Sequence, residues 1–407
     1  MRFERLKEYI ELHYASAVAL RRDIHAHPET ALSEYQTTER IRNYLKYPGI
    51  LLEDMGTRTG LCALVTGTGS GKNALLRADI DALPAKEQTN LPFRSEVEAC
   101  HCCGHDIHIA TVALCARVLA DMRDRISGSV RFLFQPAEET LEGAKLFLQA
   151  GILERQPKTD YALSLHCSNF TDAGKVALIA GPAAASADRF RIMVKGKGGH
   201  VVHPQNCIDP ITPACAIVFH LRAFMTQELD PFCRAVLGIG SIHGGSADNM
   251  IPDVVTIEGT LRTFDEALRK KILKRIEEIV IESARTYGAE GSVLFSGHCP
   301  ATVHDAAMVE QMADIVRSTL GADHLEFMQR PAMGSEDFGF FAEHLPALQI
   351  RLGTGSEQAG GRLGVHNPAV IFQEDVIKTG AEVLSAFLFS QYQQGVVSTA
   401  AKEETGI

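Results

Sequence analysis

Two short apolar segments, VRFLFQP (residues 130–136) and YALSLHC (residues 161–167), decide the fold class of this chain. Both have the length and apolar content of buried strands. A helical pattern separates them (residues 143–150), and another precedes them (residues 107–122). Strands that alternate with helices predict an α/β domain with a mainly parallel sheet.

The same alternation extends in both directions from these segments. The chain is predicted to be helical to about residue 45, with a break at Pro28, and strands follow at residues 61–67 and 73–84. Gly69 to Lys72 lies between these strands and resembles a phosphate-binding loop. The required spacing fails, because a Thr stands at position 66 and an Asn at position 73. We therefore predict a hairpin turn there.

The pattern changes near residue 180, where small residues lead into a strand with alternating apolar positions. Six elements then follow in the order β-α-β-β-α-β, which is typical of a ferredoxin-like unit. This arrangement predicts a catalytic domain (1–184 and 298–395) interrupted by an inserted domain (185–297). The polar residues 396–407 are predicted to form a disordered tail.

Composition excludes several classes of protein. The 407 residues carry a net charge of -10, no Trp and only 7% aromatic residues, which disfavours a nucleic-acid binder. There is no apolar signal segment and no stretch of about 18 apolar residues. Ten cysteines are scattered along the chain, which favours a reduced, cytoplasmic protein without a membrane span.

Potential metal ligands follow the ends of the predicted strands. They occur in CHCCGHDIH (100–108), in QPAEE (135–139), at His166 and in GVHNP (364–368). Ligands of an open α/β sheet bind beyond the carboxyl ends of its strands, so these groups are expected to share one cleft. Such N, S and O donors suit two borderline cations, and a carboxylate beside the metals can act as a general base.

Each group alone has a simpler interpretation. Cys100 and Cys103 could form a redox pair or half of a structural zinc site, although no second pair follows at zinc-finger spacing. His166 alone would be an ordinary surface or core histidine, and Glu138 with Glu139 a solvated pair. The joint occurrence of all four groups favours the metal centre.

Eight motifs run in order over residues 20 to 375: RDIHAHPE (22–29), RADIDALP (77–84), CGHD (103–106), QPAEE (135–139), GKGGH (196–200), DNMIP (248–252), GSEDF (334–338) and HNP (366–368). Together they resemble the aminoacylase and carboxypeptidase family of two-metal amidohydrolases (peptidase family 20), in particular its hippurate-hydrolase and auxin-conjugate (IAA-amino acid) hydrolase subgroup. The resemblance implies a zinc-exopeptidase-like catalytic domain and a ferredoxin-like lid that pairs two subunits.

The resemblance also implies roles for individual residues. Two divalent ions per subunit (Mn, Zn, Ni or Co) would be held by Cys103, His105, Glu139, His166 and His366, with Cys103 as the bridge. Glu138 would be the general base, and Asp81 would orient a ligand histidine from behind. His200 would stabilise the oxyanion of a neighbouring subunit's site, and Asn249 and Arg262 would hold the substrate carboxylate. Cys100 and Cys102 depart from the subgroup's usual Met-His-Ala-Cys pattern.

These implications predict a metal-dependent hydrolase that cleaves N-acyl-L-amino acids to a carboxylate and a free amino acid. A dipeptidase or carboxypeptidase with the same metal centre is the main alternative. A non-catalytic metal-binding protein is the third, and Glu138 disfavours it, because metal binding alone needs no base. A homodimer that binds neither nucleic acid nor membrane is expected.

Overall fold

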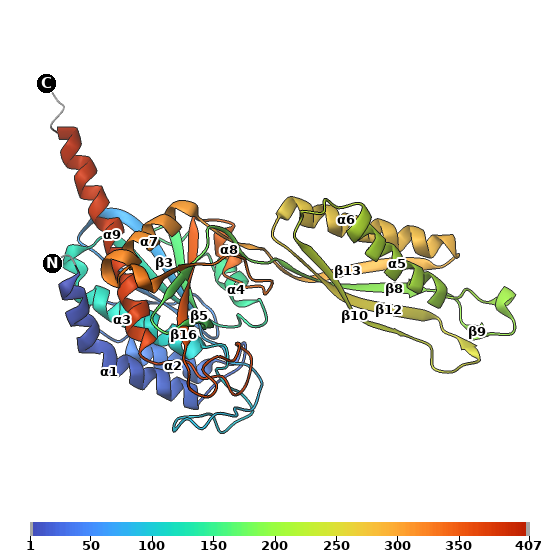
Figure 1. Cartoon of the computed structure of the whole chain (residues 1–407), viewed down its shortest axis with the longest axis horizontal. Helices are drawn as coiled ribbons and strands as arrows, with labels where there is room; N and C mark the ends of the chain where they lie inside the picture. Colours follow the sequence, from blue (N-terminus) through green and yellow to red (C-terminus); the bar gives the residue numbers. More distant parts are fainter. Residues whose placement is uncertain (1–2, 404–407) are drawn as a thin grey trace. The chain divides into compact units, whose positions relative to one another are not determined.

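The chain folds into two compact units. The structure, a computed structural model, describes the backbone of residues 3–403 and the side chains of residues 3–391. The first unit comprises Met1–Gly181, Val303–Arg330 and Phe340–Ile407, and the second comprises Pro182–Thr302 and Pro331–Gly339 (Figure 1). The second unit thus includes Pro331–Gly339, although the sequence places that segment within 298–395, the second part of the predicted catalytic domain.

A central sheet of eight strands organises the first unit. Its order is β1-β2-β4-β3-β5-β16-β6-β15, and β4, β3, β5 and β16 run parallel to one another at its centre. The strands span Leu51–Glu53 (β1), Leu61–Thr66 (β2), Gly69–Asp79 (β3), Ser127–Gln135 (β4), Tyr161–Asp172 (β5), Val176–Leu178 (β6), Leu325–Phe327 (β15) and Ala347–Gly355 (β16). The predicted α/β fold with a mainly parallel sheet is confirmed.

Helices of the first unit pack on this sheet and on each other. They span Glu4–Ala26 (α1), Tyr35–Tyr44 (α2), His105–Asp121 (α3), Gly143–Gln149 (α4), Ala306–Thr319 (α7) and Val376–Glu403 (α9). The helices α3 and α9 pack against β3, and α1 packs across both helices. Most residues of α3 are buried. The apolar side chains of this helix lie on all of its faces, which is typical of a helix inside the core. The predicted disordered tail overlaps the end of α9, and its last four residues lie outside the described part of the chain.

The hairpin predicted around Gly69 is wrong. Strand β4 lies between β2 and β3, antiparallel to the first and parallel to the second. Gly67 and Thr68 donate backbone hydrogen bonds to Gly128 and Ile126 instead, at 2.9 Å each, and β3 begins at Gly69. Sequence adjacency suggested direct pairing, but a strand that comes 60 residues later occupies the position between them.

The second unit is a four-stranded antiparallel sheet with two helices. Its sheet order is β10-β12-β8-β13, and its elements follow the predicted β-α-β-β-α-β order. They span Ala187–Lys195 (β8), Ile211–Gln227 (α5), Ala235–Gly244 (β10), Val254–Thr263 (β12), Glu266–Thr286 (α6) and Glu290–Cys299 (β13), with the short pair Gly199–His200 (β9) and Met250–Ile251 (β11). As predicted, Phe190, Ile192 and Val194 of β8 all point into the core.

Short elements lie where the chain passes between the two units: Gly181–Ala184 (β7), Thr302–His304 (β14) and Gly339–Ala342 (α8).

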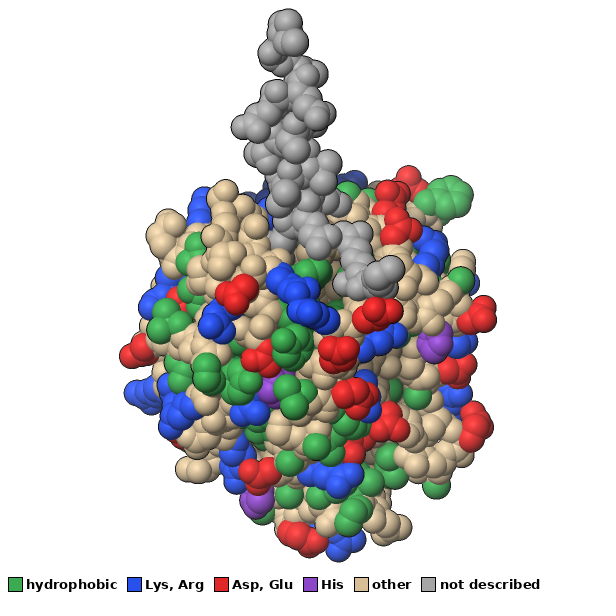
Figure 2. All heavy atoms as spheres, turned by 90° about the vertical axis from the view of Figure 1, so that its left-hand side faces the viewer, with side chains coloured by type: hydrophobic (Ala, Val, Ile, Leu, Met, Phe, Trp, Pro, Cys, Tyr) green, Lys and Arg blue, Asp and Glu red, His purple; other side chains and the backbone are tan. Residues whose placement is uncertain are grey.

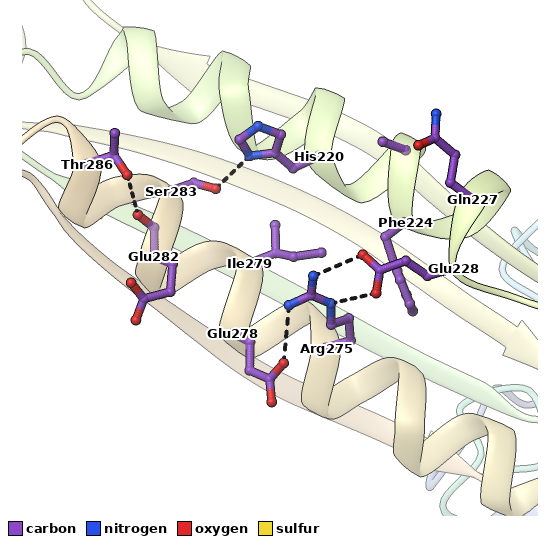
Figure 3. Close-up of a pocket in the computed structure, with 11 residues that line it drawn as sticks. His220, Phe224, Gln227, Glu228, Arg275, Glu278, Ile279, Glu282, Ser283 and Thr286 are labelled. Atoms are coloured by element: carbon purple, nitrogen blue, oxygen red, sulfur yellow. Dashed lines mark hydrogen bonds and ion pairs between the residues drawn. The ribbon is translucent and has the colours of Figure 1, made fainter.

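Two polar links join α5 and α6 across a groove of about 320 Å³ (Figure 3). Arg275 of α6 donates to both carboxylate oxygens of Glu228 at 2.9 and 3.0 Å. His220 Nδ1 lies 2.8 Å from the Ser283 hydroxyl. Phe224 and Ile279 are buried between the helices, so the groove has an apolar floor and a polar rim.

Neither sign of charge dominates the face that Figure 2 shows. Among the described residues, no helix is long and apolar enough to cross a membrane. Acidic and basic side chains are interspersed over the face that Figure 2 shows.

A buried polar network ties α1 to the start of α3. Arg21 Nε donates to Asp106 Oδ2 at 2.7 Å, and His25 Nδ1 lies 2.9 Å from the same oxygen. His25 Nε2 lies 3.2 Å from Glu87 Oε1. Burial lowers the pKa of His25, but the negative charge of Asp106 and hydrogen bonds to Asp106 and Glu87 outweigh it and raise the pKa to about 9. The network therefore holds a charged imidazolium in the interior.

Replacing His25 with Gln should make the stability of the chain less dependent on pH. The folded pKa of about 9 exceeds the ordinary value of 6.5, so the stabilisation is fully present below pH 6.5 and is lost as pH rises through 9. We expect His25→Gln to lower the free energy of unfolding by on the order of 3 kcal/mol near pH 6, with most of this difference gone above pH 9.

Urea unfolding of the metal-free wild-type chain and His25→Gln, from about pH 6 to above pH 9, measures the difference in their free energies of unfolding. The exposed His27→Gln on the same segment is the matched control and should change stability by less than about 0.5 kcal/mol at every pH. A His25→Gln difference that stays constant with pH would show that the ring is not charged.

Candidate metal centre

Five predicted metal ligands gather in the first unit. His166 lies on β5, and Glu139 follows the end of β4. Cys103 and His105 flank the start of α3, while His366 lies in the segment between β16 and α9. Three sets of potential ligands each lie within 4.8 Å: Cys103 with His105 and His166, Cys103 with Glu139 and His366, and His105 with Glu138 and Glu139.

Local backbone geometry explains how these short segments present their side chains. Gly104 adopts a φ of 85°, and a Cβ there would lie 3.0 Å from Cys167 Sγ, so only glycine suits the turn into α3. Ala137 has a φ of 54° and donates its N–H to Glu34 Oε1 at 2.9 Å. Gly143 lies so close to the Pro136 carbonyl that a Cβ would clash at 1.7 Å. These contacts hold the turn that carries Glu138 and Glu139.

The separations between donor atoms suit divalent cations. Cys103 Sγ lies 3.5 Å from His166 Nε2, and Glu139 Oε2 lies 3.4 Å from His366 Nε2. The other oxygen of Glu139 lies 3.8 Å from His105 Nε2. Bonds of about 2.0–2.3 Å at tetrahedral angles place neighbouring ligand atoms about 3.3–3.8 Å apart. Glu139 therefore faces a different histidine with each of its oxygens.

Two buried donor atoms of the centre have no hydrogen-bond partner among the described residues. They are His105 Nε2 and Glu139 Oε1. Leaving such atoms unsatisfied costs about 1–3 kcal/mol each, so a cation bound between them would remove a real penalty. The residues present therefore fit a metal centre.

The tautomers of both buried histidines are set by backbone carbonyls. His105 Nδ1 lies 2.8 Å from the Asp81 carbonyl, and His166 Nδ1 lies 2.8 Å from the Cys167 carbonyl. A carbonyl only accepts, so each Nδ1 carries a proton, and each Nε2 is the ring nitrogen left for a cation. Asp81 also accepts the N–H groups of Glu138 and Glu139 at 3.1 and 3.0 Å. It therefore supports the site from behind, where the sequence placed it.

The charges around the site favour cation binding. Burial, followed by the negative charge of Glu139, raises the pKa of the Cys103 thiol well above its usual range. A thiolate there needs a cation beside it. Burial, together with the positive charge of Arg351, holds the pKa of His166 well below its usual range, so its ring is neutral and able to ligate.

The remaining predicted residues belong to the second unit and lie in two places within it. His200 pairs with Met250 between β9 and β11, and Asn249 accepts a hydrogen bond from Val201 at 3.2 Å. Arg262 lies near the far end of β12, eight residues beyond Val254, or about 26 Å along the strand. Its guanidinium donates to Ser335 Oγ. The second unit thus brings His200 and Asn249 together and holds Arg262 apart from them.

Sequence reasoning assigned no role to Asp79 or His108, which are fully buried beside His105. Two signals were available. Asp79 stands two residues before Asp81, and His108 follows His105 by three residues, which places both rings on one face of α3.

Comparisons with known proteins agree with this geometry. Residues 75–390 match the peptidase family M20/M25/M40. The chain is 34% identical over 367 residues to the N-acetylcysteine deacetylase of Bacillus subtilis, covering 90% of this chain and 94% of that protein. It is 35% identical over 372 residues to the IAA-amino acid hydrolase ILR1-like 2 of Arabidopsis thaliana, covering 90% and 83%.

A carboxypeptidase and a solved structure extend the likeness. Thermostable carboxypeptidase 1 of Saccharolobus solfataricus is 36% identical over 369 residues, covering 89% of this chain and 92% of that protein. The structure of Bacillus subtilis YXEP, described as a dinuclear metal binding peptidase, superposes with a TM-score of 0.81 at 30% identity and covers 94% of this chain and 99% of that one. The chain is a hydrolase of amide C–N bonds, and it belongs to the peptidase family M20/M25/M40.

Proposed function

We propose that the chain hydrolyses the amide bond of N-acyl-L-amino acids with two divalent cations bound at Cys103, His105, Glu139, His166 and His366. The convergence of these five side chains, with Glu138 beside them, is the observation that carries the proposal. When bound, the cations polarise an amide carbonyl and lower the pKa of water. Mn, Zn, Ni and Co all accept this mixed set of N, O and S donors.

Glu138 is proposed as the general base. It is buried at 6% exposure, and its oxygens lie in one group with His105 Nε2 and Glu139. Its backbone N–H donates to Asp81 Oδ1 at 3.1 Å, which fixes the backbone that carries the carboxylate. Glu138 takes a proton from the attacking water and delivers it to the departing amine nitrogen. A protein that only stored metal would need no such carboxylate.

The second unit, predicted as residues 185–297, is proposed to act as a lid and to pair two subunits. Strand β10 stands at the edge of its sheet and exposes Val236 and Ile242. Helix α5 exposes Ile211, Cys215 and Phe219 at intervals of four residues, which form one stripe. Edge strands are commonly covered by a second chain, so a copy of this unit would bury both features.

A reducing, cytoplasmic setting is also proposed. All ten cysteines lie in the described part of the chain, and all are free. Seven of them are buried, where an oxidising compartment would more often have selected disulfides.

The substrate class is tested by a hydrolysis panel of N-acetyl, N-benzoyl and indole-acetyl amino acids beside dipeptides, with each of the four metals. We expect N-acyl amino acids to be cleaved faster than dipeptides with a free amine. Faster cleavage of the dipeptides would favour the carboxypeptidase or dipeptidase alternative instead.

Glu138→Gln should retain both cations and lose about 100-fold to 10,000-fold in kcat, because the amide cannot accept the proton. Metal content by mass spectrometry and steady-state kinetics provide the two readouts. Full metal content with a loss of less than about tenfold would assign the base to another residue.

Cys103→Ser should lose metal as well as activity, because a hydroxyl is a much poorer ligand than a thiolate. Cys100→Ala and Cys102→Ala are matched controls, since both thiols are buried in the same segment and neither belongs to a ligand group. Both controls should keep two ions per chain. If Cys103→Ser still binds two ions per chain, Cys103 is not a metal ligand.

Mixing two inactive variants tests whether His200 acts on the partner subunit's site. In a mixed dimer of Glu138→Gln and His200→Ala, one site has both residues intact, so activity should recover toward about a quarter of the wild-type value. A mixture of Glu138→Gln with Cys103→Ser is the control and should stay inactive, because both residues serve the same chain's site. Demonstrated subunit exchange without recovery would place His200 in its own chain's site or outside catalysis.

A further inference from the structure

Asp79 occupies the interior beneath the proposed centre and has no role in the function proposed above. It ends β3, and its side chain is fully buried. Arg77 Nη1 donates to Asp79 Oδ2 at 2.8 Å, and His108 Nδ1 lies 2.5 Å from Asp79 Oδ1. The carboxylate is thus anchored at both oxygens by residues of the same unit.

The protonation of His108 follows from its other neighbour. The backbone N–H of Cys167 donates to His108 Nε2 at 2.9 Å. That nitrogen must therefore be an acceptor, and the ring proton must lie on Nδ1, facing Asp79. Both nitrogens of His108 are occupied, so this ring is no metal ligand although it lies among potential ones. Its function is to hold Asp79 in place and to connect it to the strand that carries His166.

The second oxygen of Asp79 faces the unpartnered nitrogen of His105. Asp79 Oδ2 lies 3.6 Å from His105 Nε2, which has no hydrogen-bond partner among the described residues, while His105 Nδ1 donates to the Asp81 carbonyl. The two atoms are too far apart for a hydrogen bond to each other, and a cation fits between them. A separation of 3.6 Å matches two ligands of one tetrahedral ion, which stand about 3.3–3.8 Å apart.

We propose that Asp79 is a further metal ligand, which contributes Oδ2 to the cation held by His105 Nε2. This inference rests on the proposed metal centre and adds a carboxylate that the five predicted ligands do not include. Arg77 uses one lone pair of Oδ2 and leaves the other for the cation. The geometry also gives His108 a defined part, because it positions Asp79 without touching the metal.

Asp79→Asn tests the assignment through metal binding instead of activity. The amide preserves the shape of the side chain but removes its charge. The stripped wild-type chain and the variant are titrated with Co²⁺, and bound metal is measured after equilibrium dialysis. We expect two ions per wild-type chain, and in Asp79→Asn one ion bound at least about tenfold more weakly. The thiolate-to-cobalt absorption of Cys103 should persist in the variant if the remaining ion lies there.

Asp188→Asn is the matched control for the loss of a buried, ion-paired carboxylate. Asp188 is buried in the second unit and is bonded at both oxygens by Arg269 at 2.6 and 2.7 Å. This variant should bind two ions with wild-type affinity. Wild-type affinity in Asp79→Asn would overturn the inference, whereas a wild-type chain that binds no Co²⁺ would overturn the proposed function itself.

A crystal structure of the Mn²⁺-loaded wild-type chain decides the question if Asp79→Asn fails to fold. An Asp79 oxygen within about 2.5 Å of an ion supports the assignment. Two well-ordered ions that both lie farther than about 3.5 Å from Asp79 would exclude it.

Discussion

The carboxylate of Asp81 accepts the backbone N–H groups of Glu138 and Glu139, while its carbonyl accepts a hydrogen bond from His105 Nδ1. One buried residue thereby links the end of β3, the turn after β4 and the first turn of α3. The parallel arrangement of β3 and β4 makes this possible, because it brings their carboxyl ends to the same edge of the sheet. The orientation of the His105 ring and the backbone position of the two glutamates both follow from it.

The sequence predicted the individual strands, which depend on local apolar pattern, and the grouping of the metal ligands, which depends on their position at strand ends. The apolar segments at residues 130–136 and 161–167 became β4 and β5, and the ligand groups behind them converged. The order of the strands in the sheet was harder to predict from the sequence. The residues of β2 and β3 contain no signal that β4 inserts between them, since strand order depends on pairing with a segment about 60 residues away in the sequence.

Spacing in the sequence could point to Asp79 and His108, but the contacts between them could not be predicted, because they depend on the three-dimensional arrangement. Asp79 and His108 are separated by 29 positions, and the acceptor role of His108 Nε2 is set by a backbone N–H on β5. No spacing rule contains that information. Likewise, the sequence assigned both Asn249 and Arg262 to the substrate carboxylate, but Asn249 lies beside the β9–β11 pair and Arg262 near the opposite end of β12.

The five proposed metal ligands come from the first unit, whereas the exposed apolar residues of α5 and β10 come from the second. Metal binding and the proposed subunit pairing are therefore encoded in separate stretches of the gene. Genetic exchange of residues 182–302 between related sequences would replace the pairing surface and leave the metal ligands unaltered. Such a division allows the two properties to diverge at different evolutionary rates.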